Sequence, residues 1–225
     1  MRLWGAVLFL QTLPNLFFFA ATAPTGLQEE KGSGLTAPPG QVKLQKEFGI
    51  SLKISRQILC KIRILTRNYL SARLSGAQLT LVPHSEDLPS VSLNFSSWIS
   101  LSNDERLSHV AKMLLFYRGL MQQLKDYEAM KEDSKFTAQF EELGWYLRDL
   151  SHHVKYQRSL WGMPSQAHLE PTLKPPQIVQ HQSQWRNRLE VNLVLRSLKN
   201  LLCRIVRDFL LLRTRVAKSL PATLE

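Results

Sequence analysis

Apolar side chains recur at spacings of three and four residues in four long stretches, at about 42–74, 103–126, 135–160 and 184–217. At about 100° per residue, this spacing places them on one face of a helix. The four stripes are Leu44, Phe48, Ser51, Ser55, Ile58, Ile62, Leu65 and Tyr69; Leu107, Val110, Leu114, Tyr117, Met121 and Leu124; Phe136, Phe140, Leu143, Leu147, Leu150, Val154 and Gln157; and Val191, Val194, Leu198, Leu201, Ile205, Phe209, Leu212 and Val216. We therefore predict an all-α protein whose four helices bury these faces against one another.

The lengths of the linkers predict the order of the helices in the bundle. A linker of about eight residues, 127–134, reaches only about 26 Å, less than the roughly 45 Å length of an about 30-residue helix. It can therefore join only antiparallel neighbours. The linkers before and after this pair can cross the bundle, which favours the up-up-down-down order of long-chain bundles with two crossover loops. A simple up-down bundle with two long loops is the alternative.

Signals at the ends of these segments refine the elements. Ser102 to Glu105 reads "SNDE", a capping-box pattern at the start of the second helix. The linker before it contains two prolines and short apolar alternations, which permit a strand-like segment but no helix. The linker before the last helix contains four prolines and is predicted to be a loop.

The N-terminal region differs in composition from the rest. Residues 1–23 have one early Arg, an apolar run and an Ala-Thr-Ala ending, which is the layout of a secretory signal peptide. Gln11, Pro14 and Asn15 interrupt the run, so we do not expect a membrane span. Residues 24–40 are predicted to be a flexible leader, 41–218 one bundle domain and 219–225 a tail. The mature protein is expected to be secreted and extracellular.

The formal net charge is +11. Such a balance suits a sulfated polysaccharide, a nucleic acid or an acidic protein partner, and secretion argues against nucleic acid. Asn94 begins the sequon Asn-Phe-Ser and is the candidate glycosylation site of an extracellular glycoprotein.

The sequence offers little for catalysis or cofactor binding. His152 and His153 are adjacent on a predicted helix and point about 100° apart, so we interpret them as solvated and expect no metal site, no cofactor and no enzyme activity. Cys60 and Cys203 both fall on the outward sides of their helices. They are either free or bridged, and helix axes about 8 to 10 Å apart make a bridge between antiparallel helices uncommon.

Trp185 is a candidate binding residue at the start of the last helix. It falls roughly 140° from the centre of the apolar stripe, with Leu189 on much the same outward side and Arg186 and Arg188 beside it. A rigid aromatic side chain among charged groups is typical of an interface hot spot. In the alternative, the indole folds back under the proline-rich loop and closes the end of the core.

Farther along the same helix we expect an outward strip of basic and apolar side chains: Arg196, Arg204, Arg207 and Leu211. This strip is either a solvated surface or a binding face. Trp98 stands alone among polar residues of the first long linker. It is either an anchor of that loop on the core or a further contact point.

Four collinear segments carry a resemblance to known proteins: "LQKEFGISLKISRQIL" (44–59), "LVPHSEDLPSVSLNFSSWISLSNDERL" (81–107), "LGWYLRDLSHHVKYQ" (143–157) and "RIVRDFLLL" (204–212). Together they resemble the interleukin-27 alpha subunits, a group of helical cytokine subunits in the interleukin-6 and interleukin-12 families. The resemblance implies a heterodimer with a soluble receptor-like beta subunit, and immune signalling through receptor-associated Janus kinases and STAT proteins.

The resemblance also implies which residues bind which partner. Trp98, Arg204, Arg207 and Leu211 would bind the beta subunit. Trp185, Arg186, Arg188 and Leu189 would bind the shared signal-transducing receptor of the interleukin-6 family. Exposed residues of the first and third long helices would bind the interleukin-27-specific receptor chain. A secreted carrier whose amphipathic helices bind lipid or polyanions is the alternative function.

Overall fold

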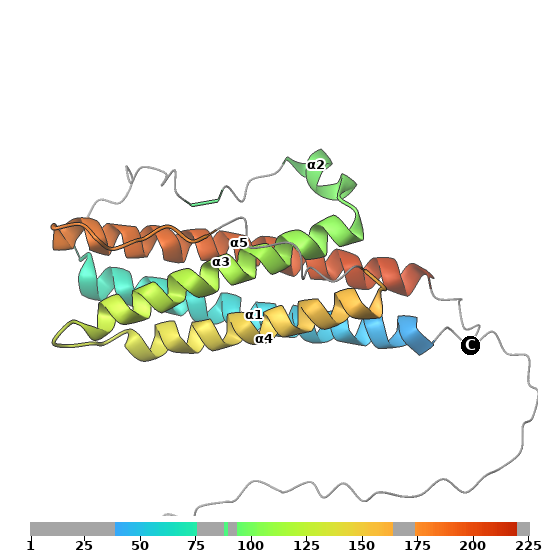
Figure 1. Cartoon of the computed structure of the whole chain (residues 1–225), viewed down its shortest axis with the longest axis horizontal. Helices are drawn as coiled ribbons and strands as arrows, with labels where there is room; N and C mark the ends of the chain where they lie inside the picture. The colour runs from blue at the N-terminus through green and yellow to red at the C-terminus, as the bar shows by residue number, and fades with distance from the viewer. Residues whose placement is uncertain (1–38, 76–87, 90–93, 164–173, 220–225) are drawn as a thin grey trace, which may run out of the picture. The chain divides into compact units, whose positions relative to one another are not determined.

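The computed structural model describes residues 39–75, 88–89, 94–163 and 174–219 (Figure 1). Within these residues the chain forms only helices: α1 (Pro39–Arg73), α2 (Phe95–Ser100), α3 (Asn103–Ala129), α4 (Thr137–Leu160) and α5 (Gln184–Ser219). The prediction of an all-α protein with four long helices is confirmed.

The described helices all belong to one compact unit of the chain, Leu35–Glu225. The predicted signal peptide and most of the predicted leader lie outside the described residues, as does all of the tail except Ser219. The leader was predicted to reach residue 40, but α1 already begins at Pro39. None of the described helices combines the length and apolarity that crossing a membrane requires.

All residues of the four predicted stripes are buried, so each helix does turn its stripe inward. The serine and glutamine side chains of the stripes have hydrogen-bond partners, whereas the buried Tyr69 hydroxyl has none among the described residues. Ser55 Oγ donates to the carbonyl of Ser51 (2.7 Å), and Gln157 Nε2 donates to Ser51 Oγ (2.6 Å) and to the carbonyl of Glu47 (3.0 Å). These bonds reduce the cost of burying polar groups between α1 and α4.

Contacts between side chains show which helix ends lie together. Gln157, late in α4, bonds to Glu47, early in α1. Arg73 at the end of α1 bonds to Glu128 at the end of α3 (2.5 Å), and Arg188 near the start of α5 reaches the carbonyl of Arg73 (3.5 Å). α1 packs against α5 and α4, and α3 packs against α4 and α5.

The first long linker contains a helix that the sequence analysis excluded. α2 is one and a half turns long, and Asn94 caps it by accepting a hydrogen bond from the backbone N–H of Ser97 (2.7 Å). The remainder of the predicted strand-like linker lies almost entirely outside the described residues. Directly after α2, Ser102 and Glu105 make both hydrogen bonds of the predicted capping box at the start of α3.

The described end of the last linker is fastened to α3. The side chain of Gln123 donates to the carbonyl of Pro176 (3.0 Å) and accepts from the N–H of Ile178 (2.9 Å). A Cβ atom at Gly119 would lie 2.7 Å from Pro175 Cγ, so only glycine lets the linker pass this closely over α3. Because this part of the linker is attached to α3, the chain enters α5 from a fixed position.

Candidate functional site

The first candidate binding surface surrounds Trp98, which α2 holds beside α5; we define this Trp98 surface as Phe95, Trp98, Arg207 and Leu211. The Trp98 indole N–H donates to Asp208 Oδ1 (2.7 Å). The guanidinium carbons of Arg106 and Arg207 lie 4.9 and 5.8 Å from the centre of the indole ring. Cation–π attraction to both arginines therefore adds to the hydrogen bond in orienting the ring.

A buried ion pair lies directly beneath this surface. Arg106, at the start of α3, is 1% exposed and donates to Asp208 of α5, which is also buried. A second Arg106 nitrogen donates to the carbonyl of Trp98 (2.6 Å). Because Arg106 and Asp208 bind both the backbone and the ring of Trp98, this tryptophan is an anchor of the loop as well as a half-exposed surface residue.

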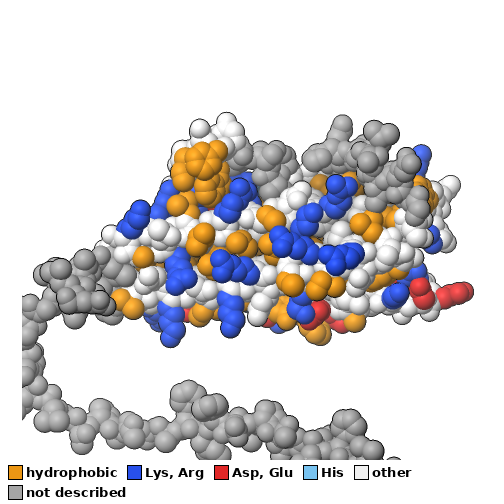
Figure 2. Space-filling view, turned by 180° about the vertical axis from the view of Figure 1, so that it is seen from behind, with side chains coloured by type: hydrophobic (Ala, Val, Ile, Leu, Met, Phe, Trp, Pro, Cys, Tyr) orange, Lys and Arg blue, Asp and Glu red, His pale blue; other side chains and the backbone are white. Residues whose placement is uncertain are grey.

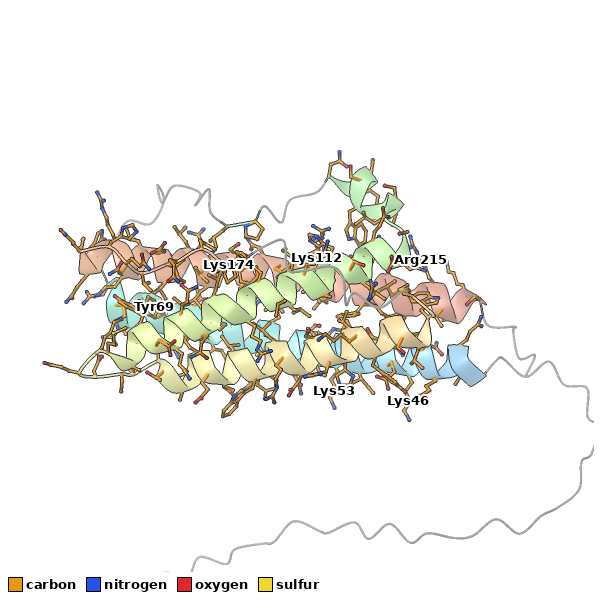
Figure 3. The ribbon with its side chains drawn as sticks, viewed as in Figure 1. Lys46, Lys53, Tyr69, Lys112, Lys174 and Arg215 are labelled. Carbon is orange, nitrogen blue, oxygen red and sulfur yellow. The ribbon has the colours of Figure 1, made fainter. Side chains whose placement is uncertain are left out.

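Further contacts join α5 to the same region. Arg215 donates to the Asn103 side chain (2.7 Å) and to the carbonyl of Ile99 (3.2 Å), and Figure 3 shows its side chain near the start of α3. Phe95 is 73% exposed, and its ring centre lies 5.8 Å from that of Trp98. Sequence analysis did not predict Phe95 as a surface contact residue. Its position in the exposed sequon, three residues before Trp98, could have indicated this role.

Arg204 does not lie where it was predicted. It was placed on an outward strip, but it is only 3% exposed, and its Nε lies 3.9 Å from Asp208. Burial lowers its pKa, and the nearby Arg106 and Arg207 charges act in the same direction. The physical reason is that α5 buries a second flank beside α3, in addition to the stripe that faces the core. Arg196 and Arg207 are exposed as predicted, and Leu211 is half-buried.

Asn94, the candidate glycosylation site, is exposed. Its side-chain oxygen caps α2, so the amide nitrogen, to which an N-linked glycan attaches, is the other atom of the same group. A glycan at this position would stand beside the Trp98 surface, because Phe95 and Trp98 follow within one turn of α2.

The second candidate binding surface lies at the start of α5. Trp185 is 46% exposed and Arg186 is exposed, which confirms the predicted exposure and contradicts the alternative in which the indole closes the core. Arg188 is half-buried, and its guanidinium contacts Gln184 Oε1 (3.4 Å). Leu189 was predicted to point outward, but it is half-buried and packs against the core. We define the Trp185 surface as Gln184, Trp185, Arg186 and Arg188.

A cluster of charges supports this end of the bundle. The fully buried Glu128 accepts from Arg73 (2.5 Å) and Lys131 (2.6 Å), and Arg73 also donates to Asp133 (2.7 Å). The hydrogen bonds that Arg73 makes to Asp133 and Glu128 raise the pKa of Arg73. The hydrogen bond between Arg73 and Asp133 also lowers the pKa of Asp133. A hollow of about 680 Å³ opens here, lined by Arg73, Tyr127, Met130, Lys131, Glu132, Asp133, Gln184, Asn187 and Arg188.

Asn187 fixes the approach of the chain to the Trp185 surface. Its side chain donates to the carbonyl of His181 (2.8 Å) and accepts from the His181 N–H (2.9 Å). Glu190 accepts from the N–H of Val179 (2.7 Å), where the backbone has a φ of 58°. The buried Asn187 and the half-buried Glu190 thus supply hydrogen-bond partners to backbone groups of the loop, so α5 begins at a defined residue.

The remaining candidate residues do not form a metal site among the described residues, where no group of three or more His, Cys, Asp or Glu side chains comes together. His152 is exposed, whereas His153 is half-buried and lies 3.2 Å from Glu47 of α1, so only His152 is solvated as predicted. Cys60 and Cys203 are both free. Cys60 is exposed as predicted, and Cys203 packs partly against the core.

Comparison with known proteins identifies relatives of this chain. It is 33% identical over 205 residues to interleukin-27 subunit alpha of Sus scrofa, an alignment covering 84% of each protein. It is 31% identical over 129 residues to interleukin-27 subunit alpha of Homo sapiens, which covers 55% of this chain and 52% of the human protein. No protein-family model matches the chain.

Proposed function

The chain belongs to the interleukin-27 alpha subunit family of cytokine subunits, and from this premise we propose that it is a secreted ligand that pairs with a soluble receptor-like beta subunit. The main support for this proposal is the similarity to interleukin-27 subunit alpha over 84% of the chain. The helical bundle, which exposes two aromatic surfaces, adds to this support. The complex would activate cell-surface receptors that signal through Janus kinases and STAT proteins in immune regulation.

We assign the beta subunit to the Trp98 surface. Interface hot spots are enriched in Trp and Arg, and they need a side chain that is held in its bound orientation before docking. Trp98 meets this requirement through its bond to Asp208 and its two arginine neighbours. Arg207 and Leu211 complete the contact area, and the buried Arg204 lies beneath it beside Asp208.

We assign the shared signal-transducing receptor of the interleukin-6 family to the Trp185 surface. A 46% exposed indole at a helix start offers a large apolar contact, and Arg186 and Arg188 beside it would steer an acidic partner. Leu189 supports the helix from the core side. The Glu128 cluster holds the ends of α1 and α3 next to this surface, so the indole is presented on a rigid base.

The interleukin-27-specific receptor chain would bind the remaining exposed face, between α1 and α4. This face presents Tyr156, which is 40% exposed and has Lys43 5.3 Å from its ring centre. Lys61 bridges the same two helices by an ion pair with Glu142 (2.8 Å). The three faces are separate, so the proposal allows the three partners to bind together.

The up-up-down-down order with two crossover loops is part of this proposal. It is supported by the contacts between the ends of α1 and α3 and between Arg188 and Arg73, and by the direction of the colours along the long helices in Figure 1. Removal of residues 1–23 as a signal peptide and a glycan on Asn94 also belong to the proposal.

The alternative function is a secreted carrier whose amphipathic helices bind lipid or polyanions, and its lipid-binding form has less support. A carrier needs an apolar face open to its cargo. The stripes of this chain are instead at most 5% exposed. Their apolar faces are already used within the bundle.

Two substitutions test the assignment, and each is the control of the other. We expect Trp185→Ala to leave pairing with the beta subunit unchanged and to lower receptor activation more than tenfold, the loss typical of a hot-spot residue. Arg207→Glu should weaken pairing about tenfold or more, because it reverses an exposed charge at the interface. Pairing is measured by surface plasmon resonance, and activation by STAT phosphorylation in cells carrying both receptors.

Circular dichroism would confirm that both variants keep the helical content of the unmodified chain. Full STAT phosphorylation with Trp185→Ala would contradict the assignment of the shared receptor. Unaltered beta-subunit affinity with Arg207→Glu would contradict the assignment of the Trp98 surface.

A further inference from the structure

The exposed flank where α1 and α5 lie side by side carries many positive charges and no negative ones. We name the α1–α5 seam by its basic side chains, which are Lys53, Arg56, Arg63, Arg67, Arg196, Lys199 and Arg213. Lys199 is half-buried and the other six are exposed. In the part of the chain that the structure describes, no carboxylate forms an ion pair with any of them.

The few acidic residues of the two helices are engaged elsewhere. Glu47, the only acid of α1, lies beside His153 on the α4 side. On α5, Glu190 binds the N–H of Val179, and Asp208 is buried with Arg106. The positive charge of the seam is therefore not neutralised by the residues of its own helices.

Two contacts set the register between the helices. The Arg213 guanidinium lies 4.0 Å from the position of a Cβ atom on Gly49, and Arg188 reaches the carbonyl of Arg73 at 3.5 Å. Between these contacts both antiparallel helices advance about 1.5 Å per residue. Arg63 and Arg67 consequently lie at the levels of Lys199 and Arg196, which places four cations in one stretch of the seam.

Figure 2, seen from behind, shows Lys and Arg side chains spread along this face, with the fewer carboxylates at one end and along the lower edge. Figure 3 shows Lys53 projecting away from the bundle. Like charges this close repel one another within a Debye length of about 8 Å at physiological salt. A linear polyanion laid along the seam would remove this repulsion and release its own counterions.

We propose that the α1–α5 seam binds a sulfated glycosaminoglycan, which would retain the protein at cell surfaces and in the extracellular matrix. A sulfated polysaccharide fits because the site is an extended row of cations spanning two helices, with arginine in five of seven positions. Arginine binds sulfate-like oxyanions through two parallel N–H donors. This inference goes beyond the proposed function, and it needs neither the beta subunit nor a receptor.

The test compares two variants with equal loss of charge. The seam variant is Arg63→Gln, Arg67→Gln, Arg196→Gln and Lys199→Gln. The control variant, with two substitutions on α3 and two on α4, is Lys112→Gln, Arg118→Gln, Arg148→Gln and Lys155→Gln. Binding of the full chain to heparin is measured by surface plasmon resonance between about 0.1 and 0.5 M salt, with desulfated heparin as a comparison.

We expect the seam variant to bind heparin at least about tenfold more weakly at physiological salt, and the slope of log affinity against log salt to fall by about three. The control variant should lose less than about threefold. Heparin should raise the melting temperature of the unmodified chain and of the control variant, but not that of the seam variant.

Equal losses in both variants would overturn the proposal, because net charge alone would then explain binding. Binding that desulfated heparin supports equally well would also overturn it. So would tighter binding to vesicles containing phosphatidylserine than to heparin, since the seam would then recognise a membrane. None of these results depends on receptor activation, so failure here is distinguishable from failure of the proposed function.

Discussion

His109, on α3 close to Asp208 and Arg204, is a half-buried histidine next to the Trp98 surface. Its Nε2 is buried and has no hydrogen-bond partner among the described residues. Burial lowers its pKa from 6.5, the Arg204 and Lys112 charges lower it further, and Asp208 acts in the opposite direction. The folded protein therefore disfavours the protonated imidazole.

This shift predicts how stability responds to pH. Because the folded pKa lies below the unfolded value, the unfolded chain binds the proton more readily. The contribution of His109 to stability is complete above about pH 6.5 and is lost as the pH falls toward the folded pKa. We expect His109→Gln to flatten the loss of unfolding free energy between about pH 7 and pH 5, as measured by urea denaturation. Parallel profiles for the two proteins would contradict this prediction.

At the residue scale, helical spacing predicted the exposure of Trp185 and Arg207 correctly. The exposure of each residue depends mainly on its angular position around the axis of its own helix. Helical spacing was wrong for Arg204 and Leu189. Both fall outside the apolar stripe but are covered by groups distant in sequence. The hydrogen bond from Trp98 to Asp208 joins positions 110 residues apart, so no local pattern could predict it.

At the scale of the elements, the capping box fixes where α3 begins. The Glu105 N–H donates to Ser102 Oγ (3.2 Å), and the Ser102 N–H donates to the Glu105 carboxylate (2.8 Å). Hydrogen bonding to the Ser102 side chain, and to a smaller extent to its backbone N–H, lowers the pKa of Glu105. Since Arg106 follows immediately, the cap also sets the direction from which Arg106 reaches Asp208.

We expect Ser102→Ala to lower the free energy of unfolding by about 1 kcal/mol, because it removes one of the hydrogen-bond acceptors of the helix start. Ser75→Ala is the control, since Ser75 is exposed and its side chain makes no hydrogen bond within the described residues. Urea denaturation of both variants measures the effect. Equal stability of the two variants would show that the cap contributes nothing.

The sequence predicted the long helices to within a few residues because their stripes persist over many turns. It missed α2, whose six residues are too few to show a period. That helix is stabilised by the Asn94 cap and by the contacts of Trp98 with α3 and α5. Tertiary contacts, which sequence spacing does not report, therefore decided its structure.

At the scale of the bundle, the Trp98 surface and the Trp185 surface each rest on one buried carboxylate. Asp208 organises the end that carries Trp98, and Glu128 organises the end that carries Trp185. Arg106 and Glu128 lie on the same helix, about 33 Å apart at about 1.5 Å per residue. Most of the buried side chains are apolar. The two ends are thus joined by a rigid helix but have independent charge clusters.

This separation predicts independent local stability at the two ends. Removing one partner of a buried ion pair typically costs about 3 kcal/mol or more, because the other charge stays buried. We expect Asp208→Asn to speed hydrogen exchange about a hundredfold in amides that open locally around α2 and the start of α3. Glu128→Gln should do the same at the end of α3 and the start of α5.

Hydrogen exchange followed by mass spectrometry measures both patterns in the free subunit. Amides in the middle of α3, which we expect to exchange only on global unfolding, serve as the internal reference for each variant. If the two substitutions accelerated the same set of amides, the ends would be coupled through the core. The beta subunit and the shared receptor would then influence one another's binding through the bundle, whereas independent patterns require that each partner binds its own end with unchanged affinity.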